Sequence, residues 1–258
     1  MKTGGVRSAA LDTRAYAPSL IPSRLGPERR FVVLGTGRSG SRLLLSMLRR
    51  QPRVLCDGEI LSPENRIRFP FRWVQSHAMR ARFRGARGWG FKLLVHHFRD
   101  LALVDGGRAF VDRLADAGYL VVVLTRNNLL RQAVSWERAQ IVGRHHYKVG
   151  EEREGSAVHL DPVQLLVRMG LLELENDFAR TVGKEHSHVE VCYEDDLLDA
   201  ARHQATADRV MTALDMPSAP VRTPLRRGSP DDLRDQLSNW EEVADVIGRT
   251  RYADFLTD

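Results

Sequence analysis

A glycine-rich segment near the start of the chain combines residue types that could bind an anion. It reads GTGRSGSR over Gly35–Arg42, follows the apolar run Phe31–Leu34, and leads into an apolar helical pattern that begins at Ser41. A strand, a glycine turn and a helix in this order present backbone amides to an anion at the helix N-terminus. Arg38 adds a guanidinium within the turn. We therefore interpret Gly35–Arg42 as a phosphate-binding loop.

An ATP-binding P-loop is one class of such loops. It requires a lysine and then a serine or threonine directly after its last glycine, because the lysine reaches the terminal phosphates and the hydroxyl holds magnesium. Here Ser41 and Arg42 follow Gly40 instead. The sequence nearly excludes an ordinary ATP-binding loop.

A dinucleotide-binding loop is a second alternative. The segment matches G-x-G-x-x-G from Gly35 onward, and Asp57 and Glu59 follow the next apolar run, at the place where an acid binds ribose in that class. Arg38 is unusual there, because pyrophosphate generally lies against bare backbone. A guanidinium is instead useful where charge must be neutralised on a transferring group. The loop alone leaves both interpretations open.

The elements that must position this loop follow from the pattern of apolar runs. Continuous runs rich in β-branched residues alternate with helical patterns, which is typical of a mostly parallel sheet covered by helices on both faces. The expected strands are Phe31–Leu34, Val54–Cys56, Phe91–Val95, Tyr119–Leu124 and Val189–Tyr193. The expected helices are Ser41–Arg50, Ala109–Ala117, Leu129–Val142, Pro162–Val182, Ala200–Leu214 and a short one near Trp240–Ile247. We predict a three-layer α/β/α fold.

Length and charge limit the organisation of the chain and its partners. A chain of 258 residues suits one large α/β domain. We expect residues 1–29 to form a flexible lead-in and residues 30–258 a single domain, with a polar, aperiodic loop inserted at about residues 143–160. The net charge of +6, with almost all of the positive charges on arginine, favours anionic ligands. Because no arginine run is longer than two and no basic stripe carries interleaved aromatics, we do not expect nucleic acid as a partner.

We found no sequence pattern that directs a chain to a membrane or to a metal. No apolar run reaches the roughly 18 residues of a membrane-spanning helix, and residues 1–29 lack the apolar core of a signal peptide. Cys56 and Cys192 have neither a disulfide-framework pattern nor metal-ligand spacing. We therefore expect a cytoplasmic protein without a metal site.

Two stretches resemble the nucleotide-binding elements of one enzyme family. T-G-R-S-G-S, residues 36–41, resembles the 5′-phosphosulfate loop of sulfotransferases that use 3′-phosphoadenosine 5′-phosphosulfate (PAPS), although Thr36 stands where proline is common. Tyr119–Ile141 resembles the second PAPS element, in which a strand leads to an arginine, an Asn/Pro-type turn and a helix with a serine. On this resemblance Arg126 and Ser135 hold the 3′-phosphate. Charge-assisted bonds of this kind offset the cost of desolvating a phosphate dianion.

Further stretches resemble bacterial carbohydrate and lipid sulfotransferases of the nodulation-factor and trehalose sulfotransferase type. They are Cys56–Leu61, Gly88–Lys92, Val191–Asp195 and Leu237–Glu242 with Thr250–Tyr252. The resemblance implies a P-loop-like α/β fold, PAPS as co-substrate without a metal, and a carbohydrate, glycolipid or small-metabolite hydroxyl as acceptor. The PAPS-binding residues that it implies are Thr36, Gly37, Arg38, Ser39, Gly40, Ser41, Arg42, Arg126, Ser135 and, from a basic segment Arg226–Gly228, Arg227.

Transfer of a sulfonate requires a base on one side of sulfur and cations or amides on the other. Glu59 follows the second predicted strand and should lie at the same sheet edge as the phosphate loop, so we predict that it is the base. His97 follows the third predicted strand and is the alternative base. Arg38 and the loop amides would stabilise the leaving group. Lys92 lies in an apolar strand and needs a partner, either a carboxylate or the sulfonate.

Two other functions remain open at this point. One is an NAD(P)-dependent Rossmann oxidoreductase, which the glycine spacing and Asp57 favour but which leaves Arg38, Arg126 and Ser135 unexplained. The other is a nucleotide-binding domain without catalytic activity. A homodimer and a peripheral contact with a membrane are both compatible with the sequence.

Overall fold

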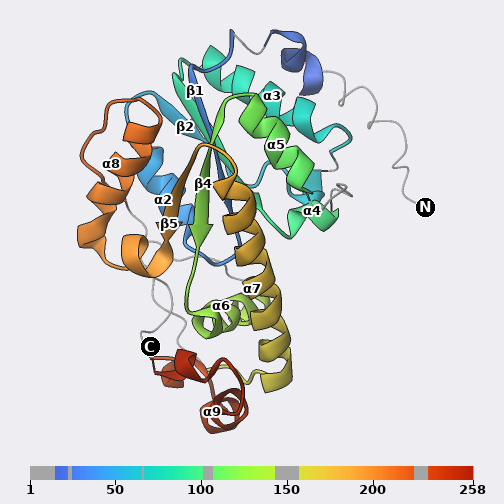
Figure 1. Ribbon diagram of the computed structural model, residues 1–258, viewed down its shortest axis with the longest axis vertical. Helices are drawn as coiled ribbons and strands as arrows, with labels where there is room; N and C mark the ends of the chain where they lie inside the picture. Colours follow the sequence, from blue (N-terminus) through green and yellow to red (C-terminus); the bar gives the residue numbers. More distant parts are fainter. Residues whose placement is uncertain are drawn as a thin grey trace.

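The centre of the protein is a five-stranded parallel sheet. The structure is a computed structural model, and it describes residues 15–22, 25–65, 67–100, 107–142, 157–223 and 232–257. Every strand pairing is parallel, and the strand order is β2-β3-β1-β4-β5 (Figure 1). The strands are β1 Arg29–Gly35, β2 Val54–Cys56, β3 Gly88–Leu94, β4 Tyr119–Thr125 and β5 His188–Cys192. Each of them lies on one of the five predicted apolar runs.

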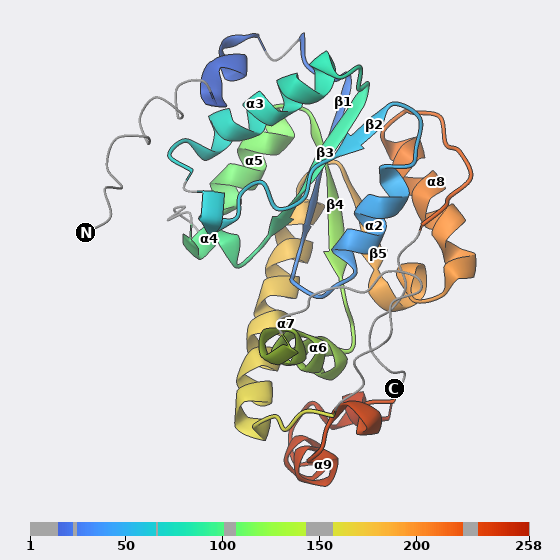
Figure 2. The same ribbon diagram turned by 180° about the vertical axis from the view of Figure 1, so that it is seen from behind.

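Helices cover both faces of this sheet, as Figures 1 and 2 show from opposite sides. Helices α2 (Ser41–Leu48) and α8 (His203–Ala213) pack on one face. Helices α3 (Pro70–Phe83), α5 (Arg108–Asp116) and the C-terminal part of α7 (Pro162–Lys184) pack on the other. The predicted three-layer α/β/α architecture is therefore confirmed.

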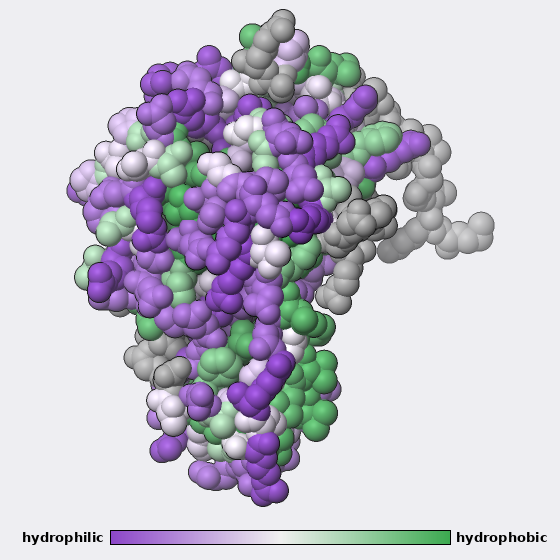
Figure 3. Space-filling model, viewed as in Figure 1, coloured by the Kyte–Doolittle hydropathy of each residue, from purple (hydrophilic) through white to green (hydrophobic). Residues whose placement is uncertain are grey.

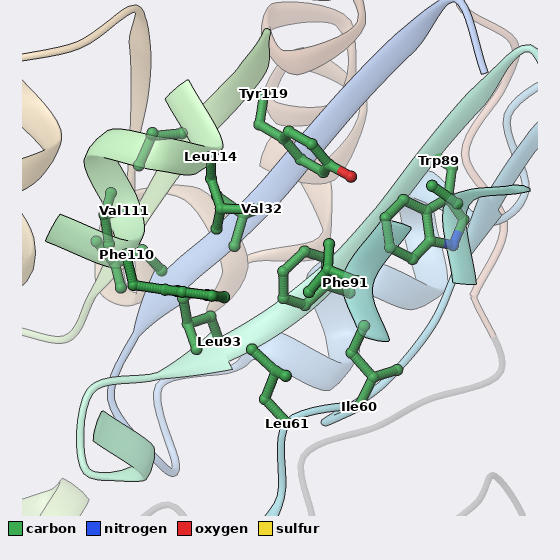
Figure 4. Packing of buried hydrophobic residues seen from close by; sticks show 14 of the residues in the cluster. Val32, Ile60, Leu61, Trp89, Phe91, Leu93, Phe110, Val111, Leu114 and Tyr119 are labelled. Atoms are coloured by element: carbon green, nitrogen blue, oxygen red, sulfur yellow. The ribbon is translucent and has the colours of Figure 1, made fainter. Parts of the chain in front are cut away.

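Strand β1 shows why the strands could be recognised from the sequence. Its residues alternate between the two cores: Val32 and Leu34 belong to the core under α3 and α5, whereas Phe31 and Val33 belong to the core under α2 and α8. A strand that is buried on both faces must be continuously apolar. Figure 4 shows the first core, where β3 contributes large aromatic side chains that pack against side chains from β4 and α5.

A third core lies beyond the carboxyl edge of the sheet. Helix α6 (Leu129–Val142), the N-terminal part of α7 and helix α9 (Trp240–Gly248) bury apolar residues against one another. With 23 residues, α7 is about 35 Å long, so it spans both this core and the sheet (Figure 1). As a consequence α6, which follows β4 after a short turn, is fixed in place beside the end of the sheet.

The remaining elements are short. They are the 3₁₀ segments η1 Ala17–Leu20, η3 Pro63–Asn65, η6 Ala200–Arg202, η7 Arg234–Gln236 and η8 Ala253–Leu256, the π-type turn η5 Tyr193–Leu197, and the single-turn helix α4 His97–Asp100. The predicted helix Ala200–Leu214 is therefore divided between η6 and α8.

Helix α3 was not among the predicted helices. Its buried residues include Val74, Ala78 and Ala81, which have the spacing of one helix face. Polar residues interrupt the apolar pattern along the rest of the helix, so it was overlooked. Pro70 at the first position starts the helix with a backbone angle that suits it.

The segment before β1 also differs from the expected flexible lead-in. The Tyr16 ring packs edge-on against Phe69 and Trp73, with ring centroids 5.9 Å and 5.6 Å away. The carbonyl of Ala15 accepts hydrogen bonds from Ser76 at 2.5 Å and Arg80 at 2.6 Å. Residues 15–20 thus pack on α3. Residues 1–14, about half of the predicted lead-in, and residues 143–156, most of the predicted inserted loop, lie outside the described residues.

Apolar side chains are also exposed on the surface of α7. Val163, Val167 and Leu174 are each at least 60% exposed, and they share one face of the helix. Figure 3 shows hydrophobic residues gathered at the lower right, where Figure 1 draws this helix. None of the helices that the structure describes is long and apolar enough to cross a membrane. Patches of this kind are typical of contact surfaces, and the homodimer stays a prediction.

The packing of α7 on β4 leads to a stability prediction. A Cβ at Gly183 would overlap Cγ2 of buried Val123, so Gly183→Ala should lower the free energy of unfolding by about 1–3 kcal/mol in urea denaturation. Gly170→Ala on the same helix is the matched control, because its Cβ would lie 3.8 Å from the Tyr252 hydroxyl. This control should be neutral or stabilising by up to about 1 kcal/mol. Equal losses in the two variants would contradict the close packing of Gly183.

Candidate active site

The predicted phosphate loop joins the carboxyl end of β1 to the N-terminus of α2. Gly40 directly precedes the helix with a φ of 89°, in the left-handed region that favours glycine. The Leu44 amide donates to the Gly40 carbonyl at 3.1 Å and so makes the first hydrogen bond of the helix. The amides that precede Leu44 in the first turn have no acceptor within a helix, and such amides bind anions.

Three predicted phosphate-binding side chains meet beside this loop. Arg38, whose φ of 63° is also left-handed, donates from Nε to Ser135 Oγ at 3.0 Å. Arg126 donates from Nη1 to the backbone carbonyl of Arg38 at 3.1 Å. A left-handed residue other than glycine costs about 1–3 kcal/mol and is typical of ligand sites. The two sequence elements that were predicted to hold phosphate are therefore in direct contact.

The side chains of Thr36 and Ser39 maintain the loop itself. Both are buried, and Ser39 donates to the Thr36 carbonyl at 2.7 Å. Gln132 on α6 donates to Thr36 Oγ1 at 2.7 Å and to the Gly37 carbonyl at 2.6 Å. We expected these two residues to contact the cofactor, and in the structure their hydroxyl groups make hydrogen bonds within the protein.

Gly37 is required by the side chain that covers it. A Cβ at this position would overlap the six-membered ring of Trp136. Trp136 follows Ser135 on α6, so the helix that binds the Arg38 guanidinium also packs on the loop backbone. The glycine spacing that matched a dinucleotide pattern is explained here by contact with a neighbouring helix.

Arg126 is buried and has several partners. Its Cζ lies 4.4 Å from the centroid of the Tyr193 ring, and its Nε lies 3.5 Å from Glu194 Oε1. Asn176 on α7 donates from Nδ2 to the Arg126 carbonyl at 3.2 Å. The charge and the backbone of this arginine are therefore both held from within the chain.

Sequence reasoning missed several of these contacts. Gln132 was not assigned a role and Trp136 was not assigned a contact with the loop, although they lie four residues apart on the face of α6 that carries Ser135. Tyr193 and Glu194 belong to the stretch Val191–Asp195, which drew attention only through resemblance. A signal for them existed in the position of this stretch at the carboxyl end of the last predicted strand, where ligands bind in open α/β sheets.

Both candidate bases lie together with Lys92. Glu59 follows β2, and its Oε1 lies 2.5 Å from Nζ of Lys92, which is on β3. Its Oε2 lies 3.5 Å from Nε2 of His97, at the start of α4. The Lys92 amide donates to the Gly58 carbonyl at 3.1 Å and fixes the segment after β2 against β3. Of the two partners considered for Lys92, the structure contains the carboxylate.

The environment of Glu59 favours its charged form. The hydrogen bond from His97 and the charge of Lys92 lower the pKa of Glu59 from 4.5 to about 2, although burial acts in the opposite direction. His97 is only 3% exposed, and its Nδ1 is buried with no hydrogen-bond partner among the described residues. Glu59 is 38% exposed in its side chain. The carboxylate is therefore the member of this pair that a bound molecule could reach.

A line of rings connects this cluster with the phosphate loop. The ring centroids of His96 and His97 are 4.6 Å apart, and those of His96 and Trp136 are 5.3 Å apart. Trp136 in turn packs on Gly37. Glu59 consequently lies on the same side of the sheet edge as the loop.

The other predicted binding residues can be placed only in part. Ser41 is buried at the first position of α2, and Arg42 beside it is exposed. Partial burial lowers the pKa of Arg42, and the Glu59 carboxylate opposes this change, which places the two charges near each other. Arg227 lies outside the described residues.

Asp57 does not occupy the position of a ribose-binding acid. In the Rossmann order the second strand adjoins the first, whereas here β3 lies between β1 and β2. Asp57 Oδ2 lies 3.1 Å from His77 Nδ1 and accepts from Trp89 Nε1 at 3.0 Å. This carboxylate connects α3 to β3, and the topology counts against the dinucleotide alternative.

Neither the cysteine thiols nor the potential metal-binding side chains form a further site among the described residues. No three His, Cys, Asp or Glu residues are placed to hold a metal ion within the described parts of the chain. Burial raises the pKa of Cys56 to about 12 and that of Cys192 to about 11. Both thiols are therefore protonated at neutral pH and are poor nucleophiles.

Comparison with known proteins finds similarity among solved structures and none in sequence. No family model matches the chain, and no curated protein matches it in sequence. Among solved structures, it is similar to the crystal structure of a sulfotransferase from Alicyclobacillus acidocaldarius, with 17% sequence identity and a TM-score of 0.49. The match covers 86% of this chain and 94% of that one.

The lowered pKa of Glu59 leads to a prediction about stability and pH. Because the folded-state pKa is about 2 and the usual value is 4.5, the stabilisation is complete above about pH 4.5 and is lost as the pH falls toward 2. The difference in unfolding free energy between the wild type and Glu59→Gln should therefore be constant near neutral pH and should shrink in acid. Denaturation at a series of pH values measures it, with Glu64→Gln on exposed η3 as control. A difference that does not change with pH would contradict the shift.

Proposed function

We propose that this protein is a PAPS-dependent sulfotransferase. The observation that carries the proposal is the contact of Arg38 with Ser135 and of Arg126 with the Arg38 carbonyl. It joins a loop suited to one phosphate with a second cationic element suited to another. PAPS and its product, adenosine 3′,5′-bisphosphate, carry phosphate on both the 3′ and the 5′ position of one nucleoside. NAD carries no such 3′-phosphate.

The residues of the loop fit the leaving side of a sulfonate transfer. The 5′-phosphate would lie against the amides at the start of α2, with the Arg38 guanidinium beside it. Arg126 and Ser135 would bind the 3′-phosphate. Negative charge develops on the bridging oxygen as the bond from sulfur to that oxygen breaks, and fixed donors stabilise such charge without having to reorganise. The electron pair of the broken bond stays on the 5′-phosphate of the product.

Glu59 fits the opposite side of the reaction. It would accept the proton of the acceptor hydroxyl while the acceptor oxygen forms its bond to sulfur. With a pKa of about 2 the carboxylate is ionised but weakly basic in the free protein. We infer that Lys92 turns from Glu59 to the sulfonate in the complex, which would raise the basicity of Glu59 where it is needed. His97 then acts by positioning the carboxylate.

The acceptor belongs to the same proposal. The sequence resemblance favours a hydroxyl of a carbohydrate, a glycolipid or a small metabolite, in a cytoplasmic enzyme that needs no metal. Incubating the protein with PAPS and a cell extract, followed by mass spectrometry for products heavier by one sulfonate group, would identify the acceptor. Products that appear only with both PAPS and the intact protein would support the assignment.

Nucleotide binding separates this proposal from the dinucleotide alternative. We expect adenosine 3′,5′-bisphosphate to bind in calorimetry with a dissociation constant in the micromolar range or below, on the order of −8 kcal/mol. We expect NAD to bind much more weakly, because it has no group for Arg126 and Ser135. Tight binding of NAD without binding of the bisphosphate would refute the proposal and favour an oxidoreductase.

Catalysis and binding should separate at Glu59. Glu59→Gln keeps the shape of the side chain but cannot accept the proton, so transfer should fall by about 10²–10⁴-fold, while the bisphosphate should bind nearly as in the wild type. Product formation under saturating PAPS measures the first effect, and calorimetry measures the second. His97→Asn is the comparison, with a smaller expected loss. Unchanged transfer in Glu59→Gln would exclude Glu59 as the base, and no transfer in the wild type with any acceptor would favour the inactive nucleotide-binding domain.

A further inference from the structure

Glu194 connects three parts of the second phosphate-binding element. Its Oε2 accepts from the Asn127 amide at 2.9 Å, and its Oε1 accepts from the Asn128 amide at 3.2 Å. The same Oε1 lies 3.5 Å from Nε of Arg126. Residues 126–128 form the turn between β4 and α6, whereas Glu194 follows β5. One carboxylate thus fixes the turn from the neighbouring strand.

The position of this carboxylate follows from charge. The amides before the first turn of α6 and the positive end of its dipole favour an anion. The buried guanidinium of Arg126 also requires a negative partner, because an uncompensated buried charge is strongly unfavourable. Glu194 satisfies both requirements when no ligand is bound. It is itself 25% exposed in its side chain and so sits at the edge of the site.

Together with its neighbours, Glu194 sets the plane of the Arg126 guanidinium. The Tyr193 ring covers one face at 4.4 Å, the Arg38 carbonyl accepts from Nη1, and Glu194 lies opposite Nε. A cation that is already oriented loses little freedom when a phosphate binds to it. Without Glu194, the Arg126 side chain and the Asn127–Asn128 backbone would each lose one of the contacts that fix them.

We propose that Glu194 is the positioning residue that gives the site its preference for a 3′-phosphate. The proposal rests on the sulfotransferase function proposed above, and it concerns binding, not the transfer step. In this proposal Glu194 makes no direct contact with the nucleotide. Its effect passes through Arg126 and should therefore be seen with a ligand that has a 3′-phosphate and be absent with one that does not.

The test compares two nucleotides on two variants. Adenosine 3′,5′-bisphosphate and adenosine 5′-monophosphate are titrated by calorimetry into the wild type, Glu194→Gln and Glu190→Gln. Glu190 is the matched control, because it lies on β5 four residues earlier, is about half exposed and pairs with Lys184 at 3.5 Å. We expect Glu194→Gln to weaken the bisphosphate by about tenfold or more and the monophosphate by less than about twofold. Glu190→Gln should change neither.

The outcomes separate the two proposals. A wild type that binds the bisphosphate no better than the monophosphate would overturn the proposed function and this inference with it. If the wild type prefers the bisphosphate and Glu194→Gln retains that preference, or binds the bisphosphate more tightly, the role of Glu194 is overturned and the proposed function stands. An equal loss of affinity for both nucleotides would also overturn the proposed role, because Glu194 would then support the fold of the site without favouring the 3′-phosphate.

If the Glu194→Gln protein does not fold, a second variant still tests the proposal. Glu194→Asp keeps the charge that the turn and Arg126 require, but it draws the carboxylate back by one methylene. We expect a smaller loss, about threefold, for the bisphosphate alone. Wild-type affinities for both nucleotides in folded Glu194→Asp would contradict the proposal.

Discussion

The contact between one face of α6 and the phosphate loop is the constraint on which the site depends. Gln132 on this face donates to the Thr36 hydroxyl and the Gly37 carbonyl. Ser135 accepts from the Arg38 guanidinium, and the Trp136 ring packs on Gly37. The contact exists because β1 and β4 are neighbours in the sheet, so the segments that leave their carboxyl ends must meet. The third core then fixes α6 in this position against the loop. A loop that is flexible by composition is thereby held rigid, as the proposed anion site requires.

The positive charge that such a site needs is compensated within the chain. Arg126 lies beside Glu194, and Lys92 lies beside Glu59. Each pair joins neighbouring strands of the sheet, with Glu194 following β5 and Arg126 following β4. Buried cations without partners would destabilise the fold before any ligand arrived. These residues can therefore come together during folding before the proposed anionic ligand binds.

The sequence predicted those features that depend on local patterns. Buried strands require continuous apolar runs, so the sheet could be placed, and the glycine loop lies between β1 and α2 as its pattern predicted. Helix α3 was missed because polar residues interrupt its apolar pattern. The roles of Glu194 and Gln132 could not be predicted, because each acts on a segment far away in sequence and the strand order that joins them is not written in either segment. Asp57 was misplaced as a candidate ribose acid for the same reason, since β3 comes between β1 and β2.

The two carboxylates of the site differ in what holds them, and this difference supports the choice of base. Glu194 is bound by two backbone amides at the start of a helix, and backbone donors cannot turn away when a ligand binds. Glu59 is bound by the side chains of Lys92 and His97, of which the lysine has a long and flexible stem. A base must be free to accept a proton at one moment and be stabilised as an anion at another. Of these two carboxylates, only Glu59 has partners that can change between those states, so Glu194 is suited to hold a cation and Glu59 to take a proton.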